Sequence, residues 1–220
     1  MELSKETLDI LRNFAGINAN ILIKKGKKLS TLAVAKNIMA SVEVVEDFDK
    51  EVGIFNLPEL LGVISMMGNP TIKLEDKYMT LTEGKTKMKY VYADQSILTF
   101  PQKDIKMPSV DVEFDLTAAQ LNQLQKAAAA LGVQDVAVVG KDEKVILQVL
   151  DKKNDSSNQY TIDLGKDTDK DFTVYFKIEN FKQIPDDYAV SVSEKNISKF
   201  VGRAMGVTYF VAVEQDSVWS

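Results

Sequence analysis

The sequence LSKETLDILRNFAGI, residues 3–17, returns later in the chain as LTAAQLNQLQKAAAALGV, residues 116–133. The two stretches share apolar positions at one fixed offset, which pairs Leu3 with Leu116, Leu8 with Leu121, Leu11 with Leu124 and Ala15 with Ala128. A repeat whose period is a whole domain predicts that one structural unit was duplicated and that the architecture is pseudo-symmetric.

A second pair of stretches repeats the order of elements. PTIKLEDKYMTL (70–81) followed by KYVYA (89–93) corresponds to YAVSVSEKNISKF (188–200) followed by TYFVAV (208–213). A chain of 220 residues has room for two domains of about 110 residues each. We therefore predict two domains, residues 1–93 and 113–220, joined by a linker at 94–112 that contains Pro101 and Pro108.

Capping residues mark the expected helices. Ser4 is a suitable N-cap for an amphipathic helix that runs to about Ala15, and Pro58 fits the first turn of a second helix over residues 57–67. In the second half, Thr117 and Gln120 form a capping-box pattern before a long helix rich in Leu and Ala. A further short helix is expected near residues 180–183.

Short β-rich segments fill the rest of each half. Residues 21–45 predict an antiparallel meander in which KKGKK, residues 24–28, is a solvated hairpin tip. Residues 72–81 and 87–93 predict two hairpin strands, and the second half shows further strands and a final hairpin. The expected fold class is α+β, with two tandem copies of a unit whose helices cover one face of antiparallel sheets.

The composition weighs against enzymatic chemistry. The chain has neither Cys nor His, which removes thiolate catalysis, the commonest general base and the usual soft metal ligands. It also lacks a nucleophile elbow, a phosphate loop and a dinucleotide fingerprint. We predict no enzyme, no catalytic residue, no cofactor and no metal site. Because the N-terminus has no signal-peptide pattern and no stretch could span a bilayer, we expect a cytoplasmic protein with no membrane partner.

The arrangement resembles the DNA polymerase sliding clamps, and most closely the two-domain clamps of tailed bacteriophages. LSKETLDILRNFAGINANILIKKG (3–26) is similar to that family's first helix and strand, and FDKEVGIFNLPELLGVISMMGNPTIKL (48–74) to its strand, second helix and strand. The resemblance implies a closed ring of six domains with helices on the inner wall and sheets outside. A two-domain chain would then form a homotrimer, with sheets that can continue across subunit boundaries.

The resemblance also implies the partners: duplex DNA bound without sequence preference, the replicative DNA polymerase, and a separate ATPase that loads the ring. Contact with the transcription machinery is compatible with it. If viral, the protein would act in the host cell cytoplasm. The net charge of −5 is unusual for a DNA-binding protein. A ring that retains DNA by topology, however, needs only a modest basic lining.

Weak phosphate contacts require basic and polar side chains on the lining helices. The candidate DNA-lining residues are Lys5, Arg12, Gln123, Gln125, Lys126 and Lys182. The simpler interpretation is that these are ordinary solvated helix residues, with Asp9 partly neutralising Lys5 and Arg12.

Apolar side chains in the linker suit a partner's short apolar peptide. The candidate docking residues are Ile97, Leu98, Phe100, Pro101, Ile105 and Met107. The alternative is that they only anchor the linker to the sheets. Two other classes of protein stay open at this point: a non-enzymatic viral structural ring or tube subunit, and a carboxylate enzyme such as a glycosidase, although no two acidic residues are placed together by the sequence.

Overall fold

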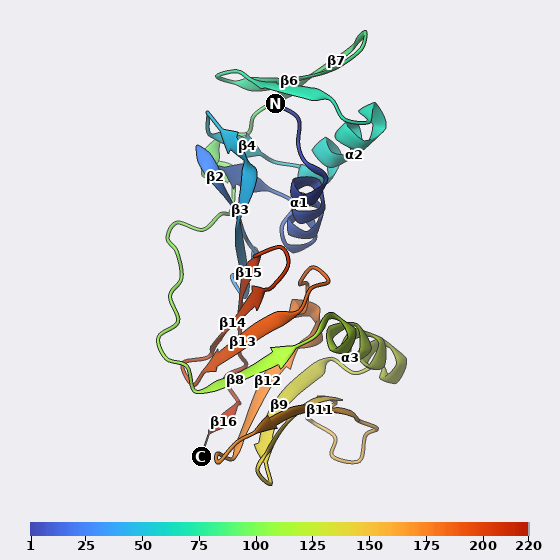
Figure 1. The fold of residues 1–220 in the computed structure, drawn as a ribbon, viewed down its shortest axis with the longest axis vertical. Coiled ribbons are helices and arrows are strands. Elements are labelled where there is room, and N and C mark those ends of the chain that lie inside the picture. Colours follow the sequence, from blue (N-terminus) through green and yellow to red (C-terminus); the bar gives the residue numbers. More distant parts are fainter. Residues whose placement is uncertain (220) are drawn as a thin grey trace. The chain divides into compact units, whose positions relative to one another are not determined.

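The structure is a computed structural model that describes residues 1–219 (Figure 1). The chain divides into two compact units, an N-terminal unit over Met1–Asp104 and a C-terminal unit from Ile105 onward. This boundary falls inside the stretch that we predict as the linker.

The N-terminal unit combines two helices with short antiparallel sheets. β1 pairs with β4, β2 pairs with β3, and β5, β6 and β7 form a three-stranded meander. Its elements are α1 (Lys5–Ile17), β1 (Ile21–Ile23), β2 (Gly26–Leu32), β3 (Ile38–Phe48), β4 (Val52–Ile54), α2 (Leu57–Met67), β5 (Thr71–Leu74), β6 (Tyr78–Glu83), β7 (Thr86–Val91) and the 3-10 turn η1 (Gln95–Ile97).

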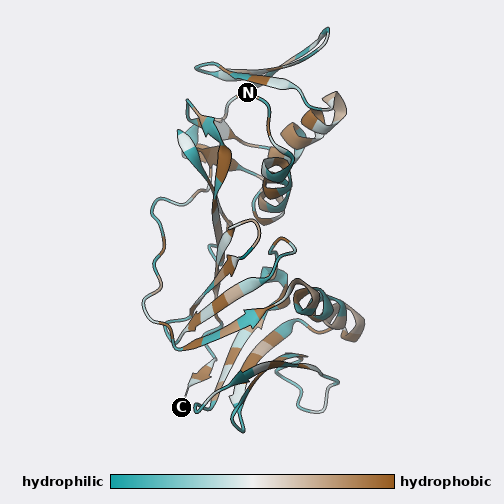
Figure 2. Cartoon of the chain, in the orientation of Figure 1, coloured by the Kyte–Doolittle hydropathy of each residue, from teal (hydrophilic) through white to brown (hydrophobic). Residues whose placement is uncertain are grey.

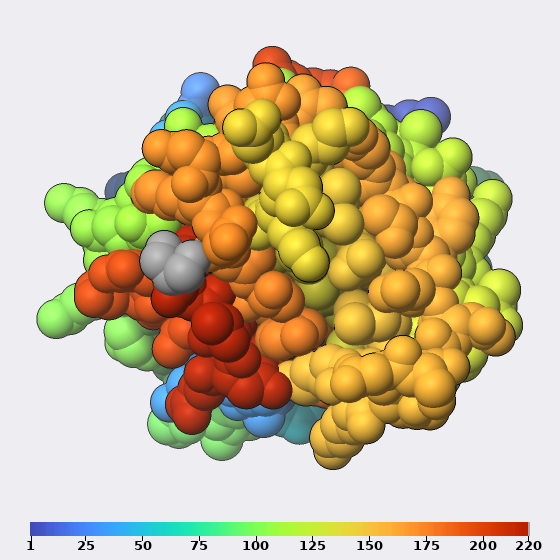
Figure 3. Space-filling view, turned by 90° about the horizontal axis from the view of Figure 1, so that it is seen from below, coloured from blue at the N-terminus to red at the C-terminus, as the bar shows by residue number. Residues whose placement is uncertain are grey.

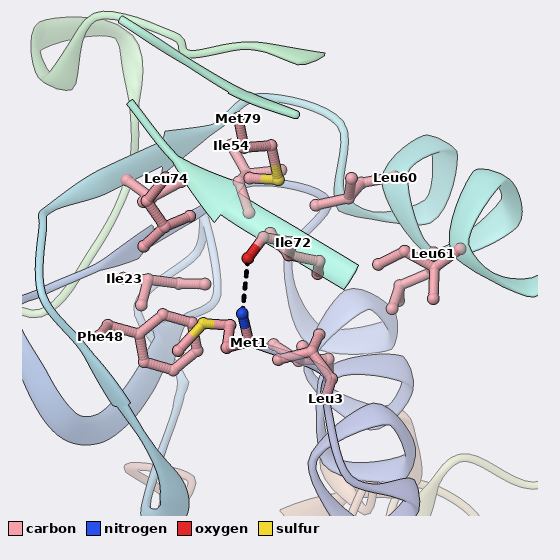
Figure 4. Close-up of a pocket in the computed structure, with 13 residues that line it drawn as sticks. Met1, Leu3, Ile23, Phe48, Ile54, Leu60, Leu61, Ile72, Leu74 and Met79 are labelled. Carbon is pink, nitrogen blue, oxygen red and sulfur yellow. Dashed lines mark hydrogen bonds between the residues drawn. The ribbon is translucent and has the colours of Figure 1, made fainter. Parts of the chain in front are cut away.

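The core of this unit lies between the helices and the strands. Ile10, Leu11 and Phe14 on one face of α1 are almost fully buried, as are Leu57 and Ile64 on α2. Figure 2 shows hydrophilic and apolar residues mixed along α1, whereas α2 is coloured mainly as apolar. The packing leaves a cavity of about 20 Å³ with an apolar lining, which Figure 4 shows between α2, β5 and the start of α1. That volume corresponds to about one water molecule, so the cavity is a packing gap and not a ligand site.

Two strand predictions in this unit need correction. KKGKK is not a hairpin tip, because β1 and β2 pair with different strands; the chain bends at Lys25, and Gly26, at φ +110°, begins β2. The predicted strand over residues 72–81 is two strands, β5 and β6. Glu75, whose N–H donates to Tyr78 O at 2.9 Å, begins the turn between them. The polar run Glu75-Asp76-Lys77 was the sequence signal for this turn.

The C-terminal unit contains one long helix and two sets of antiparallel strands. Five strands lie in the order β11-β10-β9-β12-β16, and within this unit four more lie in the order β15-β14-β13-β8. Its elements are β8 (Val112–Leu116), α3 (Ala118–Leu131), β9 (Asp135–Lys141), β10 (Lys144–Leu150), β11 (Tyr160–Asp167), β12 (Phe172–Lys177), the 3-10 turn η2 (Ile178–Asn180), β13 (Tyr188–Ser193), β14 (Ile197–Gly202), β15 (Thr208–Ala212) and β16 (Val218–Trp219).

Aromatic side chains hold this unit together. Phe181 makes edge-to-face contacts with Phe176 and Phe200, whose ring centroids lie 5.6 Å and 5.9 Å away. At the far edge, Trp219 stacks on Phe172 at 5.5 Å, because β16 pairs with β12. In the space-filling view the C-terminal segment, in red, lies on the surface beside orange residues of this sheet (Figure 3).

The structure confirms the repeated pattern. Ser4 and Thr117, which cap α1 and α3, stand at the same offset as the repeated leucines. The second pair of repeated stretches forms two antiparallel meanders, β5-β6-β7 and β13-β14-β15. The predicted helix near residues 180–183 is wrong, however: only the 3-10 turn η2 forms, and it ends at Asn180. Gln183 and Ile184 are buried in the extended segment that follows, which leads to Pro185.

Candidate functional site

The N-terminus of α1 is fixed by a buried carboxylate. Ser4 Oγ accepts a hydrogen bond from Thr7 N at 3.1 Å, the usual N-cap bond. Glu46 on β3 accepts two more, from Ser4 N and Thr7 Oγ1, each at 2.5 Å. Burial opposes ionisation of Glu46, but these hydrogen bonds outweigh it and hold the pKa of the carboxyl below its ordinary value. The start of α1 is therefore tied to the sheet by a charged group.

The outer face of α1 presents two of the candidate DNA-lining residues. Lys5 and Arg12 are both exposed and lie seven residues apart, on the same side of the helix. Arg12 Nη1 forms a salt bridge with Asp9 Oδ1 at 2.7 Å, in which both side chains keep much of their exposure. The positive charge of this face is thus partly neutralised within the helix itself.

The outer face of α3 is almost uncharged. Lys126 is exposed beside Gln123, and both line a shallow pocket against β11. Gln125 is different, because its Nε2 donates to Phe181 O at 2.8 Å and so ties α3 to the segment after η2. Lys182 is exposed next to that segment, but it does not lie on a helix. Of the candidate DNA-lining residues on α3, Gln123 and Lys126 therefore present side chains without such a tie.

α2 adds no positive charge, because Glu59 is its only charged residue. Across α1, α2 and α3 the basic residues Lys5, Arg12 and Lys126 are matched by Glu6, Asp9 and Glu59. The helix faces can therefore make a small number of weak phosphate contacts.

The linker candidates divide into anchored and accessible residues. Leu98 and Phe100 are buried and pack with Leu22 of the N-terminal unit. Asn20 Oδ1 accepts from Thr99 N at 2.9 Å, which holds the backbone between them. Pro101 is also buried, whereas Ile97 is 58% exposed. Ile105 and Met107 are half-buried in the C-terminal unit.

Sequence reasoning missed the residues that place these surfaces. Glu46 gave no sequence signal, because β3 alternates polar and apolar residues as any half-buried strand does. Asn18 and Asn20, which bond to Thr99 from 81 and 79 residues away, gave none because the contact is long-range. Over residues 1–219 no group of acidic residues has the arrangement of a metal site. In the same part of the chain no helix is long and apolar enough to cross a bilayer.

Comparisons with known proteins agree on the class. Residues 113–215 match the family model described as the gp45 sliding clamp, C terminal. The sliding clamp of Vibrio phage KVP40 is 29% identical over 97% of this chain and 99% of its own length, and that of Enterobacteria phage T4 is 28% identical over 99% and 98%.

Solved structures show the same fold. The proliferating cellular nuclear antigen of Entamoeba histolytica superposes with a TM-score of 0.69 at 17% identity and covers 94% of each chain. The A. fulgidus protein of that name, solved with the C-terminal region of FEN-1, gives a TM-score of 0.72 at 14% identity over 99% and 98%. The DNA polymerase III subunit beta of Bartonella birtlesii also gives 0.72, at 16% identity, over 98% of this chain and 65% of the other.

The fold is therefore the α+β clamp fold, as predicted. The comparisons support a DNA sliding clamp as the class of protein and, more particularly, a DNA polymerase sliding clamp of the bacteriophage type, a processivity factor for DNA synthesis. The comparisons do not favour the alternative of a viral structural ring or tube subunit.

Proposed function

We propose that this clamp is a non-enzymatic homotrimeric ring that encircles duplex DNA and tethers the replicative DNA polymerase in the cytoplasm of the host cell. A separate ATPase opens and loads it, and the transcription machinery is a further partner of the same ring. The observation that carries the proposal is the duplicated unit: two clamp-type units per chain would make a six-unit ring from three copies, as the resemblance to the sliding clamps implies.

Open strand edges supply a means of closing the ring. β7 and β11 stand at the ends of their sheets, and each pairs with one neighbour only. Their net charges are opposite: β7 has the exposed Lys87 and Lys89, and β11 has the exposed Asp163 and Asp167 against one exposed lysine, Lys166. Pairing of β7 of one copy with β11 of the next would be heterologous and would close on rotation. It would also cover two edges that otherwise invite aggregation.

Inside such a ring the helices would face the DNA. The proposed lining is Lys5, Arg12, Gln123, Lys126 and Lys182, with Gln125 as a neighbouring structural residue. A weakly charged lining favours sliding, because weak phosphate contacts exchange more easily than strong ones. Retention then depends on ring closure and not on affinity.

For the polymerase we propose docking at the linker. Ile97 is the most exposed of the candidate docking residues, and Ile105 and Met107 are half-exposed. Leu98, Phe100 and Pro101 are buried, and in the proposal they take part by anchoring the linker to the N-terminal unit.

Two measurements test the proposal. Light scattering over a wide concentration range should give the mass of three 24.5 kDa chains; a monomer at high concentration would contradict the ring. Reversal of Lys5, Arg12 and Lys126 to Glu should then reduce polymerase processivity while the mass stays that of the trimer. Unchanged processivity in that variant would remove the lining residues from the proposal while leaving the ring itself intact.

A further inference from the structure

A basic pocket lies on the N-terminal unit where the start of the linker passes β2. It has a volume of about 530 Å³ and is lined by Lys24, Lys25, Lys28, Ser30, Pro101, Gln102, Lys103 and Asp104. The four lysines are exposed, and Asp104 is the only acidic residue of the lining. The run KKGKK and Lys103 are far apart in the sequence, so only the fold brings their charges together.

The pocket already holds one carboxylate. Lys28 Nζ forms a salt bridge with Asp104 Oδ1 at 2.5 Å, on side chains that stay 46% and 70% exposed. The hydrogen bond from Lys28, with a smaller contribution from the charge of Lys24, holds the pKa of Asp104 below its ordinary value. Lys25 and Lys103, in contrast, have no hydrogen bond or salt bridge within the described residues. The pocket therefore stabilises a carboxylate, and its lysines outnumber the one acidic residue of its lining.

The face on which the pocket lies argues against DNA as its ligand. Along β2 the side chains alternate: Leu29 and Thr31 are buried on the side packed by α1, and Lys28 and Ser30 line the pocket. The pocket is thus on the side of β2 away from α1. In the proposed ring, where the helices face the duplex, this side is the outer surface.

We propose that this pocket binds an extended acidic segment of a partner protein through its aspartate or glutamate side chains. Charge complementarity identifies the occupant: three lysine charges remain after the bond to Asp104, and an extended peptide places every second side chain on one face. Lys24 also lies over the ring of Phe100, 5.7 Å from its centroid, so the site is continuous with the anchored part of the linker. The inference rests on the proposed function only for the exclusion of DNA.

A fluorescent peptide of alternating glutamate and serine is the probe, and fluorescence anisotropy with the full-length protein is the measurement. The double variant Lys25→Glu, Lys103→Glu should weaken its binding at least tenfold, because these two lysines lack partners and their loss disturbs no packing. Lys27→Glu is the matched control, since Lys27 belongs to the same run but does not line the pocket. It should change the affinity less than twofold.

Three results would overturn the inference. The first is no saturable binding of the peptide, and the second is equal weakening by Lys27→Glu. The third is a loss of duplex-DNA binding in the double variant when the wild-type protein does not bind the peptide. Light scattering on the same samples separates this test from the ring proposal. A double variant that stays trimeric but loses the peptide supports the pocket, and a wild-type monomer that still binds the peptide contradicts only the ring.

Discussion

At the scale of single residues, the unusual group is Glu46. Its carboxylate accepts from Ser4 N and from Thr7 Oγ1, and it takes the place of a side chain that would otherwise be apolar in this buried position. Because the two hydrogen bonds hold its folded-state pKa below the ordinary value, Glu46 stabilises the fold at pH above the usual glutamate range. This contribution is lost as the pH falls through the folded-state pKa.

We therefore expect Glu46→Gln to lower the free energy of unfolding by about 1–2 kcal/mol near neutral pH, since charged hydrogen bonds become neutral ones. The difference from wild type should shrink at an acid pH below the ordinary pKa of glutamate, because the contribution is lost as the pH falls toward the lowered folded-state pKa. Urea unfolding at a fixed protein concentration and at both pH values measures it. A difference that stays the same at acid pH would show that the charge of Glu46 contributes nothing.

Two glycines allow opposite predictions for the same substitution. A Cβ at Gly140 on β9 would lie 2.7 Å from Lys170 O and still nearer the ring of Phe172, so Gly140→Ala should cost about 1–3 kcal/mol by overpacking. Gly62 lies exposed inside α2 with nothing within 4 Å, and Gly62→Ala should stabilise by about 0.5–1 kcal/mol through lower backbone entropy of the unfolded chain. Thermal unfolding of both variants checks the signs, and a stabilised Gly140→Ala would refute the close approach.

At the scale of elements, α3 shows that neighbouring glutamines have different roles. Gln125 bonds to Phe181 O, whereas Gln123 stays exposed in the pocket against β11. Gln125→Ala should cost about 1 kcal/mol, because a side-chain hydrogen bond in a partly buried position is lost. Gln123→Ala, the matched control, should leave stability within about 0.5 kcal/mol of wild type. Equal unfolding free energies for both variants would contradict the structural role of Gln125.

The same scale shows what the sequence can predict. Local signals were sufficient for α1, α2 and α3, although not for the region of residues 180–183: the cap at Ser4, Pro58 in the first turn of α2, and the reciprocal bonds of Thr117 and Gln120 are all in the structure. Strand pairing was harder, because a run such as KKGKK marks a bend but does not say which strands it joins. β1 and β2 find their partners β4 and β3 through long-range contacts, which no local pattern records.

For the candidate site too, local features could be predicted from the sequence and long-range contacts could not. Exposure of Lys5, Arg12 and Lys126 could be inferred from helical periodicity, since each lies opposite an apolar face. The burial of Leu98 and Phe100 could not, because an apolar residue in a linker serves equally as an anchor or as a docking contact. The tie of Gln125 to Phe181 spans 56 residues and depends on the extended segment that replaces the expected helix.

At the scale of the whole molecule, the remaining prediction concerns ring closure. If β7 of one copy pairs with β11 of the next, the double variant Lys87→Glu, Lys89→Glu should place like charges along the shared edge. Each exposed ion pair contributes only about 0.2–1 kcal/mol, but reversal turns attraction into repulsion at every interface of the ring. The trimer should then dissociate at protein concentrations at least about tenfold higher than wild type.

A charge swap makes this prediction specific. Asp163→Lys with Asp167→Lys should weaken the trimer as the β7 variant does, and all four substitutions in one chain should restore it, because every interface then carries reversed but complementary charges. Lys141→Glu with Lys153→Glu is the control for net charge, since both are exposed lysines that lie on neither β7 nor β11. Light scattering across dilution measures the mass in each case. Failure of the fourfold variant to restore the trimer would mean that these two edges do not meet, and the ring would have to close through other surfaces.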